Sequence, residues 1–177
     1  MKIVMFDLGD TLEHQDVLLP GAIKTLRAVR AMTDSRGSKP VMALGSDFDM
    51  PNSPSEIPAI RQQYYQILSQ LRIRTFFEPV DQRVTLSTEV GVFKPHKKFF
   101  KTALNKLDGS LPFSSVLFIT ENLVHVQAAR GLGLRAIHFK GPGQTTGDVA
   151  RLVDLIPHIQ TFVGAAARVA RRKITGR

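Results

Sequence analysis

Apolar residues occur along this chain in two alternating patterns. Four short, mostly apolar runs lie at 3–6, 39–44, 115–119 and 134–139, and each is followed by polar or turn-type residues. Such runs are typical of strands that are buried on both faces, as in a parallel sheet. A weaker run at 83–86 predicts one further strand.

Segments in which apolar residues follow helical spacing alternate with these runs. We predict helices over 20–32, from a capping box of Ser53 and Glu56 to about 71, over 95–107, and up to 132 with Gly133 as the C-cap. Two more helices are predicted over 148–156 and 157–173, after a Gly-rich loop at 140–147. Strands that alternate with helices indicate an α/β fold with a doubly wound, Rossmann-like parallel sheet.

Length and composition narrow the class of protein. The 177 residues are expected to form one domain, 1–177, in which 157–177 is a C-terminal helix with a basic tail. The absence of cysteine excludes disulfides and thiolate metal sites and is compatible with a cytoplasmic protein. Because no apolar run is long enough to cross a bilayer, no membrane partner is expected. The first apolar run is also too short for a signal peptide.

Polar residues follow the predicted strands and one predicted helix boundary. Asp7, Ser46 and Glu121 come after three of the strands, and Lys94 precedes the helix predicted from Pro95. Ligands bind at the carboxyl ends of strands in open α/β sheets, so these four side chains are expected to converge on one cleft. Asp7 is then a candidate nucleophile or metal ligand, although it also suits a turn that merely ends the strand.

The start of the helix predicted from Pro95 is unusually basic. Lys94, Lys97 and Lys98 crowd a helix N-terminus that already carries partial positive charge. The arrangement is unfavourable unless the lysines point to water or an anion binds there. We expect Lys97 and Lys98 to be solvated and Lys94 to face an anion.

The order of these motifs resembles the haloacid dehalogenase-like (HAD) superfamily over roughly 1–139. FDLGDTL resembles the first motif, which supplies an Asp nucleophile at Asp7. MALGS resembles the second, with Ser46, and GVFKPHKKFF resembles the third, with Lys94. FITENLVHVQAARGLGL resembles the fourth, with Glu121 as its first acid and His125 where a second acid is common. The resemblance implies a HAD-like domain with divergent first and fourth motifs.

The resemblance also implies a chemistry that suits these residue types. A carboxylate at Asp7 attacks phosphorus and forms an aspartyl-phosphate, which water then hydrolyses. Lys94 would neutralise the phosphoryl oxygens, and Ser46 would donate hydrogen bonds to them. Mg²⁺ takes hard oxygen ligands, which Asp7, the Gly9 carbonyl, Glu121 and waters would supply. The expected partner is a phosphorylated small molecule or macromolecule.

The sequence departs from the family's pattern at two places. The family's phosphatases usually carry a second Asp two residues after the nucleophile as general acid and base, and here that position is Gly9. Losing such a group typically costs about 10²–10⁴-fold in rate. Asp10 is one residue too far along, and a hydrogen bond to its own turn is the expected role for it. In the fourth motif, His125 is a poor magnesium ligand that would pack on its helix or face solvent.

Three functions remain open, in this order of preference. The first is a phosphohydrolase that uses Asp7, slow or selective for reactive leaving groups such as acyl phosphates. The second is a non-catalytic binding or assembly module, which Gly9 and His125 favour. The third is a metal-independent dehalogenase, of which Gly9 and Asn122 are reminiscent. The short segment 13–19 leaves no room for a cap domain, so an open site that is capless or minimally capped is expected.

Charge is distributed unevenly along the chain. The formal net charge is +9, and Arg168, Arg171, Arg172, Lys173 and Arg177 lie in the last ten residues. A basic tail of this kind can contact nucleic acid, but a solvated terminus is the preferred interpretation. Assembly into an oligomer is compatible with the sequence.

Overall fold

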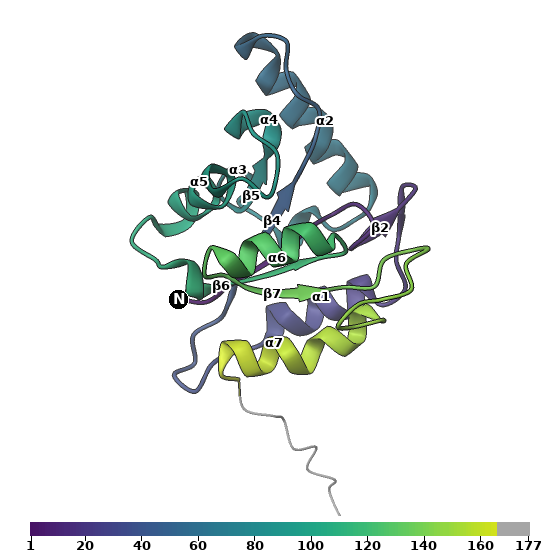
Figure 1. Ribbon diagram of the computed structural model, residues 1–177, viewed down its shortest axis with the longest axis vertical. Coiled ribbons are helices and arrows are strands. Elements are labelled where there is room, and N and C mark those ends of the chain that lie inside the picture. Colours follow the sequence, from purple (N-terminus) through teal and green to yellow (C-terminus); the bar gives the residue numbers. More distant parts are fainter. Residues whose placement is uncertain (166–177) are drawn as a thin grey trace, which may run out of the picture.

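Five parallel strands form the central sheet of the computed structural model, which describes residues 1–165 (Figure 1). The strands lie in the order β5-β4-β1-β6-β7, and their bounds are β1 Ile3–Phe6, β4 Val41–Ser46, β5 Val84–Leu86, β6 Val116–Thr120 and β7 Arg135–His138. The chain order reverses at β1, which pairs with β4 on one side and β6 on the other. This reversal opens a crevice at the carboxyl end of β1, and the predicted α/β fold class is confirmed.

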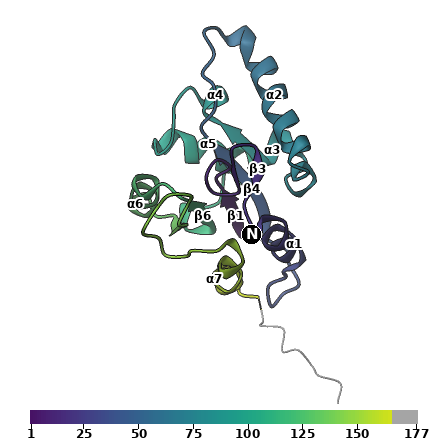
Figure 2. The same cartoon turned by 90° about the vertical axis from the view of Figure 1, so that its right-hand side faces the viewer.

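Helices cover both faces of the sheet because successive side chains in the strands point to opposite faces. Val4 and Phe6 pack on the side of α1 (Ala22–Ala31), α2 (Ile57–Gln70) and α7 (Leu155–Val163). Ile3 and Met5 pack on the side of α5 (Lys97–Asp108) and α6 (Leu123–Gly131). Figure 2 shows α1 and α6 on opposite sides of the strands. Burial of both strand faces explains the unbroken apolar runs in the sequence.

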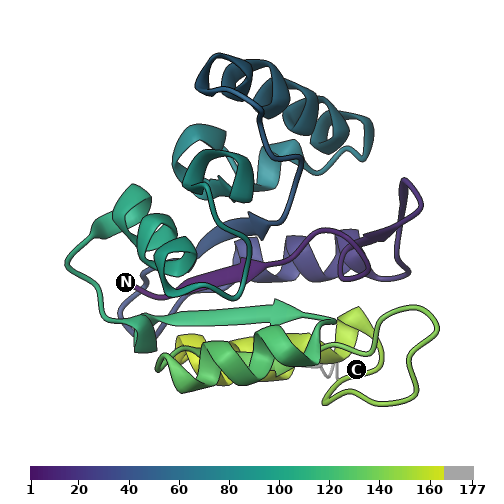
Figure 3. The ribbon, with the colours of Figure 1, turned by 45° about the horizontal axis from the view of Figure 1, so that its top comes forward.

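Short elements fill the connections of the sheet. The antiparallel pair β2 (Glu13–His14) and β3 (Val17–Leu18) is the only regular structure between β1 and α1 in the described chain. The helices α3 (Val80–Arg83) and α4 (Ser87–Val90) flank β5, and 3₁₀ turns lie at Pro54–Glu56, Arg74–Phe76, Phe113–Ser115 and Leu152–Asp154. In Figure 3, β6 points toward the side from which the β2–β3 hairpin and the 140–147 loop extend.

Several predicted boundaries are wrong for local reasons. The strand predicted to end at 44 continues to Ser46, because Gly45 and Ser46 pair with β5. The helix predicted from Pro95 begins at Lys97, and the His96 ring accepts a hydrogen bond from the Lys98 amide in its first turn. The Ser53–Glu56 capping box does not form, since the Glu56 carboxylate accepts instead from the Asn52 amide.

The C-terminal part differs most from its prediction. Residues 148–151 are not helical, because Val149 forms a β-bridge with Phe139, and α7 begins only at Leu155. Gly164, with φ of 75°, ends α7, whereas a helix over 157–173 was expected. The rest of that predicted helix, and the basic tail with it, lie outside the described residues. Within 1–165, no helix is long and apolar enough to cross a membrane.

Candidate active site

An open pocket of about 450 Å³ lies at the carboxyl ends of β1 and β4. The loop before α5 and the turn after β6 complete its wall. The candidate catalytic and ligand-binding residues predicted from the sequence all line this pocket: Asp7, Gly9, Asp10, Ser46, Lys94, Glu121, Asn122 and His125. The four side chains expected to converge, those of Asp7, Ser46, Lys94 and Glu121, therefore lie in one pocket at this edge of the sheet.

A buried ion pair lies at the centre of the pocket. The Lys94 Nζ atom is 2.5 Å from Asp7 Oδ2 and donates to the Gly45 carbonyl at 2.8 Å. Both residues are buried, with 5% of Lys94 and 7% of Asp7 exposed. The Lys94 backbone amide donates to Asp47 Oδ1 at 2.8 Å, which fixes the loop that carries the lysine. The Lys94 ammonium therefore neutralises the Asp7 carboxylate and is the only lysine or arginine side chain among the described residues that line this pocket.

The flanking lysines behave as the sequence predicts. Lys97 and Lys98 are exposed at the start of α5, whereas Lys94 is buried. However, Lys94 precedes the first residue of the helix by three positions, because α5 begins at Lys97. The anion that Lys94 faces is the Asp7 carboxylate. The conformation of the loop before α5 places the lysine there.

Two further groups hold the Asp7 carboxylate in place. The Thr120 hydroxyl donates to Asp7 Oδ2 at 3.0 Å, and the Leu8 amide donates to Asp7 Oδ1 at 3.0 Å. Thr120 is the last residue of β6, beside β1 in the sheet, and is completely buried. Thr120 was not among the residues predicted from the sequence, although it lies at a strand end, which is the signal that identified Asp7.

Ser46 is oriented by a tyrosine that sequence reasoning also missed. The Ser46 hydroxyl lies 2.6 Å from the Tyr64 hydroxyl, and the Tyr64 ring makes an edge-on contact with Phe48. Burial strongly raises the pKa of the Tyr64 phenol, so this group stays neutral. A neutral phenol can accept from Ser46 or donate to it. Helical spacing in α2 gave no sign that Tyr64 faces a site.

Glu121 lies beside Asp7 in a network of hydroxyl groups. Its Oε2 atom accepts from the Thr11 hydroxyl at 2.7 Å and lies 3.2 Å from the Thr120 hydroxyl, which also contacts Asp7. Burial and, secondly, the charge of Asp7 raise the pKa of the Glu121 carboxyl. The Asn122 side chain caps α6 by accepting from the Val124 and His125 amides, so its oxygen is engaged in holding the helix.

The divergent positions have distinct surroundings. Asp10 adopts a left-handed conformation with φ of 54°, and its Oδ1 atom is 2.5 Å from His14 Nδ1. This exposed contact replaces the hydrogen bond to its own turn that the sequence predicted. His125 is half-buried, and its Nδ1 atom has no hydrogen-bond partner among the described residues. Burial and then the Lys94 charge lower the pKa of the His125 imidazole.

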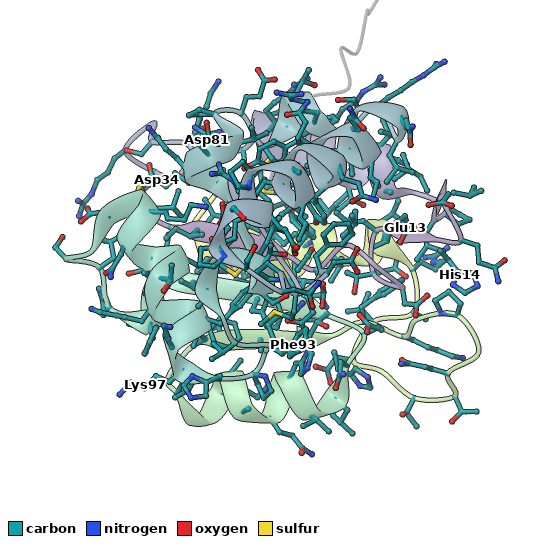
Figure 4. The ribbon with its side chains drawn as sticks, turned by 90° about the horizontal axis from the view of Figure 1, so that it is seen from above. Glu13, His14, Asp34, Asp81, Phe93 and Lys97 are labelled. Atoms are coloured by element: carbon teal, nitrogen blue, oxygen red, sulfur yellow. The ribbon has the colours of Figure 1, made fainter. Side chains whose placement is uncertain are left out.

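Glu13 also lines the pocket, although the sequence predicts only a short loop at 13–19. It belongs to β2, and its Oε2 atom accepts from the Asp16 amide at 2.9 Å. Burial is the largest influence on Glu13 and raises the pKa of its carboxyl. Figure 4 labels Glu13 and His14 on the hairpin side of the molecule. The β2–β3 hairpin brings Glu13 to the pocket. Strands of two residues are too short to show a periodic pattern, so the sequence did not predict this position.

The donor set of the pocket fits a magnesium ion that keeps most of its water. In the described residues there is no group of three or more His, Cys, Asp or Glu side chains arranged to hold a metal. Asp7 and Glu121 nevertheless contact the same Thr120 hydroxyl, which brings two carboxylates together. Mg²⁺ is commonly bound through one or two carboxylates, with waters completing its octahedron. The Gly9 carbonyl as a further ligand stays a prediction.

Comparisons with solved structures identify the fold. A HAD-superfamily hydrolase from Ehrlichia chaffeensis matches with a TM-score of 0.64 and 14% identity, covering 92% of this chain and 99% of that one. A HAD family hydrolase from Deinococcus radiodurans, solved with bound phosphate and sodium, matches with a TM-score of 0.64 and 15% identity, covering 93% and 97%. An L-2-haloacid dehalogenase matches with a TM-score of 0.54 and 19% identity, covering 82% of this chain and 57% of that one.

No family model matches the sequence, and no curated protein does either. The five-stranded parallel sheet with helices on both faces defines a Rossmann-like α/β protein. Within that class, the chain has the haloacid dehalogenase-like fold. Because the matched structures include both hydrolases and a dehalogenase, the fold leaves the reaction open.

Proposed function

We propose that this protein is a phosphohydrolase that acts through an aspartyl-phosphate on Asp7. The observation that carries the proposal is the buried contact between Asp7 and Lys94 in an open pocket that also receives the Ser46 hydroxyl. A phosphoryl group brings several negatively charged oxygens, which a buried ammonium and a hydroxyl donor suit. The HAD-like fold supports the proposal by analogy only.

The reaction proceeds in two steps. In the first, an oxygen of the Asp7 carboxylate bonds to phosphorus, and the bond from phosphorus to the leaving-group oxygen breaks with its electron pair on that oxygen. In the second, water attacks phosphorus and the bond to Asp7 breaks, which releases inorganic phosphate and restores the carboxylate. Lys94 and Ser46 offset the charge on the phosphoryl oxygens in both steps.

Thr120 and Leu8 act on the nucleophile before the substrate arrives. Their donor groups contact the two different oxygens of Asp7, at 3.0 Å each. A carboxylate held at both oxygens keeps one geometry toward the pocket, which lowers the cost of orienting it for attack. A bound Mg²⁺, held by Asp7 and Glu121, would supply further neutralisation of phosphoryl charge.

The experiment is hydrolysis of an aryl phosphate and an acyl phosphate by the full chain, with magnesium or with chelator. Turnover that requires magnesium and disappears in Asp7→Asn supports the proposal. Turnover that survives Asp7→Asn contradicts it. Asp7-dependent release of halide from a 2-haloacid without metal would instead support the dehalogenase.

A binding module is the alternative if neither compound is hydrolysed. Ligand binding stabilises the folded state by about 2.7 kcal/mol at a concentration of a hundred times Kd. A binding module for phosphorylated partners should therefore show a rise in Tm with inorganic phosphate and magnesium, and Lys94→Met should abolish that rise. Folded protein with neither turnover nor such a rise contradicts both functions.

A further inference from the structure

Proton transfer is the part of the proposed reaction that Asp7, Lys94 and Ser46 do not supply. A leaving-group alkoxide needs a proton, and the attacking water must lose one. Asp7 is occupied as the nucleophile, and Lys94 as its buried ion-pair partner. The group that moves the proton must be another acid of the same pocket, so the remaining pocket carboxylates can be compared by their contacts.

Four of the five remaining carboxylates of the pocket are poorly suited. Asp47 accepts from the Lys94 amide, and Glu121 accepts from the Thr11 hydroxyl beside Asp7. Asp10 contacts His14 and is half exposed, at 52% of its side chain. Asp16 is exposed in the turn of the hairpin. Each is therefore engaged elsewhere or open to solvent.

Glu13 is placed differently from these four. Its Oε2 atom also accepts one hydrogen bond, from the Asp16 amide at 2.9 Å, and what distinguishes Glu13 is the place of its other oxygen. Its Oε1 atom lies 3.7 Å from the position that a Cβ atom would take on Gly9, and no other heavy atom outside the neighbouring residues lies within 4 Å of that position. The Glu13 carboxylate thus occupies the pocket wall just beyond the turn that carries Asp7, beside a position without a side chain.

We infer that Glu13, delivered by the β2–β3 hairpin, is the general acid and base of this site. The inference rests on the proposed function. As the leaving-group oxygen separates from phosphorus, it takes the proton of the Glu13 carboxylic acid. In the second step the Glu13 carboxylate takes a proton from water while the water oxygen bonds to phosphorus, and the electron pair of the broken bond returns to Asp7. Glu13 ends the cycle protonated, as it began.

Leaving-group dependence tests this role directly. General-acid help matters for a poor leaving group and matters little for a good one. In Glu13→Gln, we expect kcat/KM for phenyl phosphate to fall by about 10²–10⁴-fold and kcat/KM for para-nitrophenyl phosphate to fall far less. This ratio reports the first step, in which the leaving group departs, and not the second step, which is the same for both esters. The carboxamide oxygen of Gln can still accept from the Asp16 amide, so the hairpin should be retained. The matched control is Glu78→Gln, which removes an exposed carboxylate outside the pocket.

A second variant tests whether the position of the acid is what matters. Gly9 has no positive φ, and a Cβ atom there meets only an ordinary contact with Glu13. In the Glu13→Gln background, Gly9→Asp should restore turnover of phenyl phosphate. An equal loss of kcat/KM on both esters, no loss on either, or no restoration by Gly9→Asp overturns the inference. The Asp7→Asn variant distinguishes failure of this inference from failure of the proposed function. Turnover that survives Asp7→Asn overturns the proposed function itself.

Discussion

At the scale of single residues, Asp7 and Lys94 form a buried ion pair whose contribution to stability can be measured. Removing one partner of such a pair leaves an uncompensated buried charge, which typically costs about 3–5 kcal/mol. Lys94→Met should therefore lower the free energy of unfolding by about this amount. The same substitution combined with Asp7→Asn should cost clearly less than the sum of the two single changes. Urea unfolding of the four proteins measures this, and additive costs would show that the pair is not coupled.

His125 is expected to make the free energy of unfolding depend on pH. Burial and the Lys94 charge hold the pKa of its imidazole below the ordinary value of 6.5 in the folded protein. The unfolded chain therefore takes up this proton first as the pH falls, so stability is complete above about 6.5 and declines below it. In His125→Gln, unfolding free energies at pH 5.5 and 7.5 should differ by less than in the natural chain. An unchanged difference would contradict the assignment.

The residues of the site were predictable to different degrees. Asp7, Ser46, Lys94 and Glu121 could be predicted because each lies at or just after the end of a strand, or before a helix, and topology brings such positions together. Tyr64 and Glu13 could not be predicted. The apolar spacing of a helix and a strand of two residues do not indicate which site these side chains face. Asp10 was misjudged because its left-handed conformation directs the side chain to His14.

At the scale of elements, close packing of β4 against β1 and α5 positions the lysine contact. A Cβ atom on Gly45 would lie 3.0 Å from Met5 Sδ and 3.1 Å from the Phe99 ring. Gly45→Ala should therefore overpack the core and cost about 1–3 kcal/mol. Gly131→Ala is the matched control, since its Cβ would meet nothing within 4 Å and alanine favours the helix by about 1 kcal/mol. Equal unfolding free energies for the two variants would contradict this packing.

Strands could be predicted from the sequence where both of their faces are buried. The four apolar runs became strands because both their faces are covered by helices. The helix expected over 148–156 failed because Val149 pairs with Phe139, a long-range contact that local spacing does not reveal. The boundary at Lys97 shifted because the Lys94 loop is held by Asp47 and Asp7 instead of by helical hydrogen bonds.

At the scale of the whole molecule, the pocket depends on segments that are far apart in the chain. Asp7, Ser46, Lys94 and Thr120 come from four segments, and the central position of β1 in the sheet joins three of them. The formal net charge of +9 favours the approach of anionic substrates at low salt. Contact of the basic tail with nucleic acid, and assembly into an oligomer, stay predictions.

Chemical trapping of the covalent intermediate tests the central claim most directly. The full chain would be mixed with an acyl or aryl phosphate and magnesium, quenched in acid, and treated with borohydride, which reduces an aspartyl-phosphate to homoserine. Peptide mass spectrometry should find homoserine at position 7, and Asp7→Asn should show none. Turnover without modification at position 7, or modification at another carboxylate, would contradict the account.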